Sequence, residues 1–238
     1  FKGCTQLASI TIDCYRTAIE SNSFDDCNKL DQLVFGDTVD VIRKKTTDIV
    51  QVIKTVKRIV IPKTVEVIEK ESFAEYSALT EIEIPASVKF IGKEAFAECS
   101  SLAQIEIPPS VTTIESLCFM SCTLLKQVSI PSSINIIDKF TFSKCTSLSQ
   151  IMIPDSVKIV DDESFSGCSS LTKVEIPESV QVIGKCSFRG CTHLSAIILS
   201  KTVEKIDDNA FEGCTSLTKV EIPESVQIIG KCSFRGCT

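Results

Sequence analysis

The sequence predicts a mainly β or α/β repeat protein: a solenoid of about ten 23-residue coils, with a parallel sheet on one face and irregular or short extended segments on the other. Three features support this fold class. One period runs along the whole chain, every coil repeats the same order of apolar residues, and one slot per coil holds an aromatic ring. Self-similarity at a fixed period of this length is the signature of stacked repeats.

The period is easiest to read in the stretch 168–191, CSSLTKVEIPESVQVIGKCSFRGC. Positions are numbered from its first residue, Cys168, as position 0; Leu then stands at +3, apolar residues at +6 and +8, Pro at +9, Val at +12, Ile at +15 and Phe at +20. Coils begin at Cys4, Cys27, Ile53, Tyr76, Cys99, Cys122, Cys145, Cys168, Cys191 and Cys214. The coil from Cys27 has 26 residues, because of an irregular stretch at 43–52 that we expect to form a helical turn or loop on the convex side; Val50 is the expected substitute for its missing Phe.

Each coil begins with an extended segment. In the coil from Cys99, Ile105 and Ile107 alternate with polar neighbours, which is the period of a half-buried strand. Pro108 follows and lacks an N–H group, so it ends the strand. We expect Ser or Thr at +11 to bond to the local backbone at this corner, and the residues at +12, +15 and +20 to point inward.

A single coil cannot be stable alone. Its large apolar side chains contribute roughly 1.5–3 kcal/mol each when they are buried, whereas ordering the backbone costs roughly 1–2 kcal/mol for every residue. Neighbouring coils must therefore cover both flat sides, and stability becomes a sum of nearest-neighbour interactions. With strands about 4.8 Å apart, the array spans roughly 45–50 Å.

Position +14 carries a second apolar column beside the inward residue at +15. Its members are Val41, Val67, Phe90, Ile136, Ile159, Val182 and Ile228. Two consecutive residues of an extended segment cannot both point into the core. We expect a bend that buries both; the alternative is an exposed apolar band along one flank, which would offer a surface for lateral self-association or hetero-association.

The repeated motif L-x-x-[IV]-x-I-P-x-S-V-x-x-I-x-x-x-x-F-x-x-C resembles the BspA-like (Treponema pallidum type) leucine-rich repeats. In the coil from Cys168 its positions are occupied by Leu171, Val174, Ile176, Pro177, Ser179, Val180, Ile183, Phe188 and Cys191. The resemblance covers essentially the whole chain and implies a leucine-rich-repeat solenoid. Proteins with these repeats are often surface adhesins of anaerobic bacteria and of parasitic protists, so the resemblance also implies protein–protein recognition at a cell surface.

Composition narrows the class of function. The net charge is −6, with acidic and basic residues interspersed, which disfavours nucleic acids and anionic membrane surfaces as partners. No apolar run approaches the length of a membrane span. The unbroken period over 1–238 indicates a single array. It starts and stops within a coil, and the coils 168–190 and 214–236 are nearly identical, so we interpret the chain as a fragment of a longer array.

The cysteines are expected to be structural. Nine of the 13 share position 0, where Ile53 and Tyr76 also occur, so this slot is an apolar packing position and free thiols are favoured over disulfides. Stacked slots would still allow disulfides by distance. Cys118 and Cys186 lack the paired ligands of a metal site, and His193 at +2 is expected to be a solvated rim residue.

The acidic pairs Asp161–Asp162 and Asp207–Asp208 fall in the turn at +16 and +17. We expect solvated turns there; a weak cation site is the alternative. No spacing in the sequence is that of a metal site, a phosphate-binding loop or a catalytic pair. The prediction is therefore a protein without cofactor, metal or catalytic residues.

The remaining candidate for function is the outward side of the predicted strands, positions +5 and +7, because repeat arrays bind along an extended face of variable residues. Glutamine is frequent at its centre, and two residues are apolar where a solvated strand would carry polar ones. The predicted binding residues are Glu81, Glu83, Gln104, Glu106, Gln127, Gln150, Met152, Lys173, Glu175 and Ile198.

Three functions are compatible with these features. The first is a non-enzymatic recognition module of a cell-surface or secreted adhesin-type protein, as the resemblance implies. The second is a structural scaffold subunit inside the cell, which the free thiols favour because a reducing compartment preserves them. The third, an enzyme, would need a second domain outside this array. The expected partner is a protein, without nucleic acid or membrane insertion.

Overall fold

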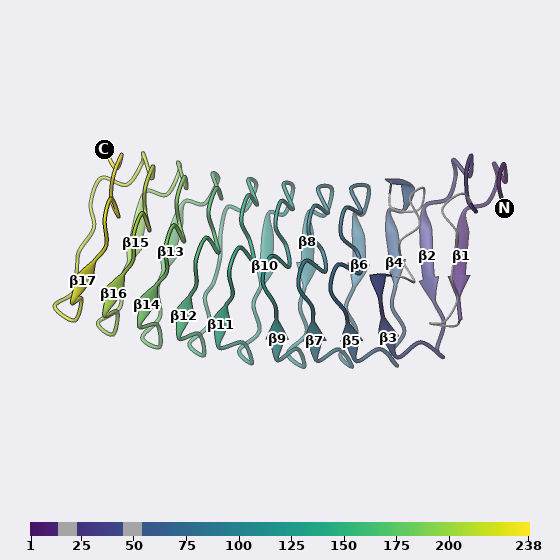
Figure 1. The fold of residues 1–238 in the computed structure, drawn as a ribbon, viewed down its shortest axis with the longest axis horizontal. Coiled ribbons are helices and arrows are strands. Elements are labelled where there is room, and N and C mark those ends of the chain that lie inside the picture. The colour runs from purple at the N-terminus through teal and green to yellow at the C-terminus, as the bar shows by residue number, and fades with distance from the viewer. Residues whose placement is uncertain (14–22, 45–53) are drawn as a thin grey trace.

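The computed structural model describes residues 1–13, 23–44 and 54–238, which form an elongated solenoid whose coils follow one another from the N-terminus to the C-terminus (Figure 1). Each regular coil contributes to two parallel ladders that enclose the core between them. The predicted solenoid with a parallel sheet is therefore confirmed, and the short extended segments opposite form a second parallel sheet. Val50 and most of the expected turn at 43–52 lie outside the described residues.

The first ladder consists of the strands that the alternation around +6 predicts. They are β1 (Ser9–Ile12), β2 (Gln32–Phe35), β4 (Arg58–Val60), β6 (Glu81–Glu83), β8 (Gln104–Glu106), β10 (Gln127–Ser129), β13 (Lys173–Glu175) and β15 (Ala196–Ile198). Partners are parallel and in register, so that Gln104 lies opposite Gln127 of the next coil. Gln32 lies opposite Arg58, so the ladder crosses the 26-residue coil without losing register.

The second ladder consists of two-residue strands at +14 and +15. They are β3 (Val41–Ile42), β5 (Val67–Ile68), β7 (Phe90–Ile91), β9 (Thr113–Ile114), β11 (Ile136–Ile137), β12 (Ile159–Val160), β14 (Val182–Ile183), β16 (Lys205–Ile206) and β17 (Ile228–Ile229). The residue at +15 is buried in every described coil except the last, and the residue at +14 faces outward, half-buried or exposed.

The expected bend that buries both +14 and +15 is therefore wrong. The segment stays extended because its backbone pairs with neighbouring coils, as Ile159 does with Ile136 on one side and Val182 on the other. Alternation along an extended chain then sends +14 outward. The alternative interpretation, an apolar band along one flank, describes the structure, with Thr113 and Lys205 as its polar interruptions.

A tight turn from +16 to +22 closes each coil and adds a third line of hydrogen bonds. Its alternate N–H groups donate to carbonyl oxygens of the next coil, as that of Phe96 does to Cys118 at 2.9 Å. With the N–H groups pointing to the next coil in this way, the backbone is left-handed at +18 and +22. Glu94 at +18 has a φ of 58°, and Glu98 at +22 has a φ of 63°. Non-glycine residues rarely adopt this region, and at +22 later coils carry glycine, such as Gly190 with φ 72°.

Phenylalanine at +20 forms the centre of the core. From Phe73 to Phe234 the rings of successive coils stack, with centroids 5.3–5.5 Å apart. The planes of Phe96, Phe119 and Phe142 lie within 4° of parallel. The predicted inward position of this residue is confirmed, and each coil covers the aromatic ring of its neighbour.

At the corner after the first strand, the structure confirms the predicted role of proline, but the hydroxyl at +11 bonds differently from the prediction. Proline at +9 follows the strand as predicted, and its carbonyl oxygen accepts the N–H of +12, as in Pro108 and Val111 at 3.0 Å. Where the hydroxyl at +11 donates to a backbone carbonyl oxygen, that oxygen belongs to the preceding coil and not to the local corner. Thr64 Oγ1 donates to the carbonyl oxygen of Val39 at 2.7 Å, because the nearest free acceptor belongs to the preceding coil.

Each ladder has one interruption within the described residues. On the first side β6 and β8 are not hydrogen-bonded neighbours, and on the second side β9 and β11 are not. Between β10 and β13 the first ladder continues through isolated bridges, Ser129 to Met152 and Gln150 to Lys173. The third line of hydrogen bonds crosses both interruptions, so the coils remain aligned while the strand face opens between β6 and β8.

Candidate functional site

The outer side of the first ladder carries all ten residues of the predicted binding strip. In β6, β8, β10 and β13 the two outer residues are exposed and the central residue is buried. Gln150, Met152 and Ile198 are exposed on the same side. The structure thus brings the predicted residues together on one extended face, while their binding of a partner stays a prediction.

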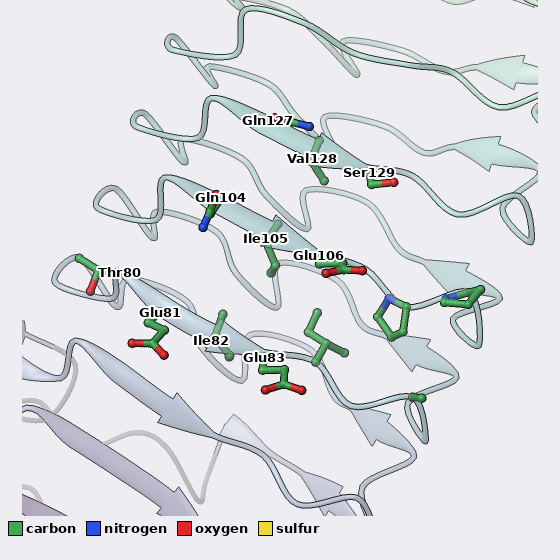
Figure 2. Close-up of a pocket in the computed structure, with 14 residues that line it drawn as sticks. Thr80, Glu81, Ile82, Glu83, Gln104, Ile105, Glu106, Gln127, Val128 and Ser129 are labelled. Atoms are coloured by element: carbon green, nitrogen blue, oxygen red, sulfur yellow. The ribbon is translucent and has the colours of Figure 1, made fainter.

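A hollow of about 730 Å³ lies in this face, over β6, β8 and β10 (Figure 2). Five of the predicted residues line it: Glu81, Glu83, Gln104, Glu106 and Gln127. The hollow includes the interruption between β6 and β8. The other predicted residues lie beyond it, farther along the same face.

Carbon-rich surfaces line the rest of the hollow. Ile82, Ile105 and Val128 line it with the small exposed part of their side chains (Figure 2). Pro108 and Pro109, which follow β8 in the sequence, also line it. The hollow is therefore amphipathic, with carboxylates and amides beside apolar surface. Such a surface suits a partner that offers both carbon and polar groups.

Charge is distributed unevenly along this face. Within β13, Lys173 and Glu175 form an ion pair at 2.5 Å, which neutralises that part of the face. In the hollow, Glu81 pairs with Arg58 of the preceding coil at 3.4 Å. No lysine or arginine is among the residues that line the hollow in the described part of the chain, so the carboxylates of Glu83 and Glu106 leave it with an excess of negative charge.

Two apolar residues interrupt the polar face beyond the hollow. Met152 is 82 % exposed and Ile198 is 50 % exposed. Both occupy position +7, one coil on either side of the Lys173–Glu175 pair. Single exposed apolar side chains are common on protein surfaces, but here they lie on the same face as the hollow and extend the candidate surface.

Sequence reasoning missed some residues of the hollow. Thr80, Ala86 and Pro109 also line it, beside Ser129, which stands in the predicted +7 column. The sequence held a signal for one of the three, since Pro109 belongs to the one Pro-Pro pair of the chain. The interruption between β6 and β8 has no such signal, since both strands match the repeat pattern.

The acidic pairs are structural, as their expected place in turns suggests. Asp161 Oδ1 accepts the N–H of Asp162 at 2.7 Å, and Asp162 Oδ1 accepts the N–H of Lys185 in the next coil at 3.0 Å. Gly184 precedes Lys185, and a Cβ there would lie 2.7 Å from the carbonyl carbon of Asp161. Since no side chain fits at position 184, this turn has no carboxylate of its own there. Asp162 of the preceding coil accepts its N–H instead.

Asp207 and Asp208 repeat this arrangement. Asp207 accepts the N–H of Asp208 at 2.8 Å, and Asp208 accepts the N–H of Lys231 at 2.6 Å. All four carboxylates accept hydrogen bonds from backbone N–H groups of the turns. These hydrogen bonds explain why two aspartates are adjacent in each turn, and no bound cation is needed to explain it. Among the residues that the structure describes, no group of three or more His, Cys, Asp or Glu side chains is placed to hold a metal ion.

The described thiols of position 0 are free, and most are buried. Cys122 Sγ donates to the carbonyl oxygen of Phe96 at 3.2 Å, and the pattern repeats between Cys168 and Phe142 at 3.1 Å. Burial raises the pKa of the Cys122 thiol to about 12. A neutral, buried thiol is neither a nucleophile nor a metal ligand at physiological pH, so the predicted packing role is confirmed.

His193 does not activate a cysteine. Its Nδ1 lies 2.7 Å from the carbonyl oxygen of Ser169, and its side chain is exposed. The nearest thiol in sequence, Cys191, is buried and donates to the carbonyl oxygen of Phe165 at 3.3 Å. The predicted rim position of the histidine is confirmed.

The whole chain matches one family profile, described as "BspA type Leucine rich repeat region (6 copies)", over residues 1–57, 51–172 and 158–238. The chain belongs to the BspA-type leucine-rich repeat family. The motif resemblance is thereby confirmed. No helix among the described residues of this BspA-type array has the length and apolarity to cross a membrane.

Two solved structures illustrate the likeness. A leucine-rich repeat protein from Bacteroides ovatus is 26% identical, with a TM-score of 0.61; the match covers 100% of this chain and 78% of that chain. A leucine rich cell surface protein from Faecalibacterium prausnitzii is 28% identical, with a TM-score of 0.51; the match covers 82% of this chain and 60% of that chain. No curated protein matches the BspA-type array significantly.

Proposed function

We propose that this BspA-type array is a non-enzymatic protein-recognition module, part of a surface-exposed or secreted adhesin-type protein. It binds its partner along the outer face of the first ladder. The observation that carries this proposal is the amphipathic hollow over β6, β8 and β10, which lies within the predicted strip. The hollow is open to solvent and continuous with an exposed strand face. This shape suits a protein segment, whereas a small-molecule site encloses most of its ligand.

The surface location is supported by the relative from Faecalibacterium prausnitzii, which is described as a cell surface protein. Since the match covers 60% of that chain, location and partner are inferred for this chain and are open to direct test. Antibodies against the array should label intact cells of the source organism. Labelling only after permeabilisation would contradict the surface location.

A scaffold role inside the cell is the second candidate. Two observations favour it: the buried thiols are free, which suits a reducing compartment, and the second ladder presents an apolar band at +14. This role predicts intracellular antigen and contacts through the second ladder. The labelling experiment and the cross-linking experiment below therefore separate the two roles.

Site-specific photo-crosslinking tests the binding face. The photoreactive residue p-benzoylphenylalanine replaces Gln104 or Gln127 in the hollow, or Gln181 as a matched control; Gln181 is an exposed glutamine between the corner and β14. Adducts on intact partner cells are expected from positions 104 and 127 but not from position 181. Adducts only from position 181 would place the interface on the other ladder and reject the proposal.

A further inference from the structure

The hollow over β6, β8 and β10 has three properties that together indicate the chemistry of its occupant. Two of its three carboxylates, Glu83 and Glu106, are in no ion pair, it has apolar surface beside them, and it lies where the first ladder lacks hydrogen bonds. Elsewhere on this face the strands as far as β15 are bridged to their neighbours, and the other carboxylates of position +7, Glu175 and Glu221, form ion pairs.

The first property is the uncompensated charge. Glu83 and Glu106 occupy position +7 in adjacent coils, on the two strands that face each other across the interruption. Like charges on neighbouring strands are destabilising. Both side chains are exposed, and no ion pair within the described residues involves either of them, whereas Glu175 of the same column is paired with Lys173.

The second property is the apolar surface beside the carboxylates. Ile84, Pro108 and Pro109 line the hollow together with the edges of the central strand residues. A lysine or arginine side chain carries a cation at the end of an aliphatic stem, and it buries that stem along apolar surface while its charged end stays near water or a carboxylate. The hollow is complementary to such a side chain in both respects.

The third property is the interruption of the ladder. Where β6 and β8 lie side by side they are not hydrogen-bonded neighbours, so backbone N–H and C=O groups of both strands lack their ladder partners there. Backbone polar groups without a ladder partner need another one, from water or from a ligand that itself carries donors and acceptors. This property favours a polypeptide over an isolated cation.

We propose that the hollow binds a cationic segment of a partner protein, with lysine or arginine side chains over Pro108 and their charged groups at Glu83 and Glu106. This inference rests on the proposed recognition function and adds the chemistry of the partner. Glu81 contributes less, because Arg58 already neutralises it. The segment continues toward Met152, which offers an exposed apolar contact on the same face.

Binding of a fluorescein-labelled nona-arginine peptide, followed by fluorescence anisotropy at low salt, tests the proposal. Two double variants are compared: Glu83→Gln with Glu106→Gln in the hollow, and Glu175→Gln with Glu221→Gln as the matched control. Both pairs occupy position +7, change the net charge equally and replace exposed residues. Glu175 and Glu221 differ in being paired with Lys173 and Lys219.

The hollow variant is expected to weaken binding at least about tenfold, and the control variant less than about twofold, because a directed contact exceeds the effect of overall charge. Equal weakening by both variants would show attraction by net charge alone and overturn the proposal. Equal binding of a nona-glutamate peptide would overturn it too. Circular dichroism of each variant checks that the coils remain folded.

The outcome is distinguishable from failure of the recognition function. If the partner cross-links at position 104 and is unaffected by the change of Glu83 and Glu106, the face binds but the occupant is not cationic. If neither cross-linking nor peptide binding occurs on this face, both the recognition function and the cationic occupant are rejected. If both occur and depend on these two carboxylates, the proposal is supported.

Discussion

Two columns of side chains run along the solenoid with the same spacing, one inside and one outside. Inside, position +20 is phenylalanine in each described coil from Phe73 to Phe234, and its rings stack. Outside, position +7 changes character from coil to coil: Glu83, Glu106, Ser129, Met152, Glu175, Ile198 and Glu221. A ring at +20 must fill the same cross-section and contact identical neighbours, whereas a residue at +7 faces solvent.

This difference separates stability from recognition. Uniform interior columns allow coils to stack, and the exterior column can vary without cost to the fold. Substitutions in an interior column should therefore change the free energy of unfolding, whereas substitutions in the exterior column should change the affinity for a partner.

High pH should unfold the array by titrating an entire interior column. Burial raises the thiol pKa values of Cys99, Cys122, Cys145, Cys168, Cys191 and Cys214. For Cys122 and Cys214 the pKa rises from an ordinary 9.0 to about 12. The folded state thus holds protons that the unfolded state loses above pH 9, so this stabilisation is complete below pH 9 and declines as the pH rises toward 12.

Each buried thiol should therefore lower the stability of the folded state progressively as the pH rises above 9, and the thiols of the column act together. Circular dichroism between pH 7 and pH 11 measures the loss of structure, and a thiol reagent should react with the buried cysteines only as it unfolds. A variant with Cys99, Cys122 and Cys145 changed to alanine should show a shallower pH dependence. Thiols that react at pH 8 in the folded protein would contradict this prediction.

Phe119→Ala should be the most damaging single substitution tested here. Phe119 is fully buried and stacks on Phe96 and Phe142, so its removal leaves a cavity that the neighbouring coils cannot close. We expect a loss of about 3–5 kcal/mol, measured by urea unfolding. Phe90→Ala is the matched control: Phe90 is only half-buried at +14, and its loss should cost about 1–2 kcal/mol. Equal costs would remove the distinction between interior and exterior columns.

Asp162→Ala should have an intermediate effect on stability, because its carboxylate accepts a hydrogen bond from a turn of the next coil that has no carboxylate of its own at this position. Asp162 accepts the N–H of Lys185 at 3.0 Å and pairs with Lys139 at 3.0 Å. Its loss should destabilise the array by about 1–2 kcal/mol. The control, Asp155→Ala, changes the same residue type at an exposed corner position and should shift stability by less than about 0.5 kcal/mol.

The sequence was sufficient for the periodic features and insufficient for the local ones. Phe119 and Cys122 could be placed in the core because a residue repeated in one slot meets the same neighbours in every coil. The orientation at +14 was mispredicted at Ile159, because the hydrogen bonds that keep this pair extended come from other coils. The break between β6 and β8 had no sequence signal either, since Glu81–Glu83 and Gln104–Glu106 both match the repeat.

The smallest effect on stability should come from changing the exterior column beyond the hollow. A triple variant, with Gln150, Met152 and Ile198 replaced by alanine, removes side chains that are exposed on the strand face. Alanine is a weaker strand former, so we expect a stability change below about 1 kcal/mol in urea. Binding of the partner that cross-linking identifies should nevertheless weaken, because Met152 and Ile198 supply the exposed apolar contacts of that face. If the partner identified at Gln104 binds the triple variant unchanged, the recognition surface ends at the hollow and the cationic segment alone determines the contact.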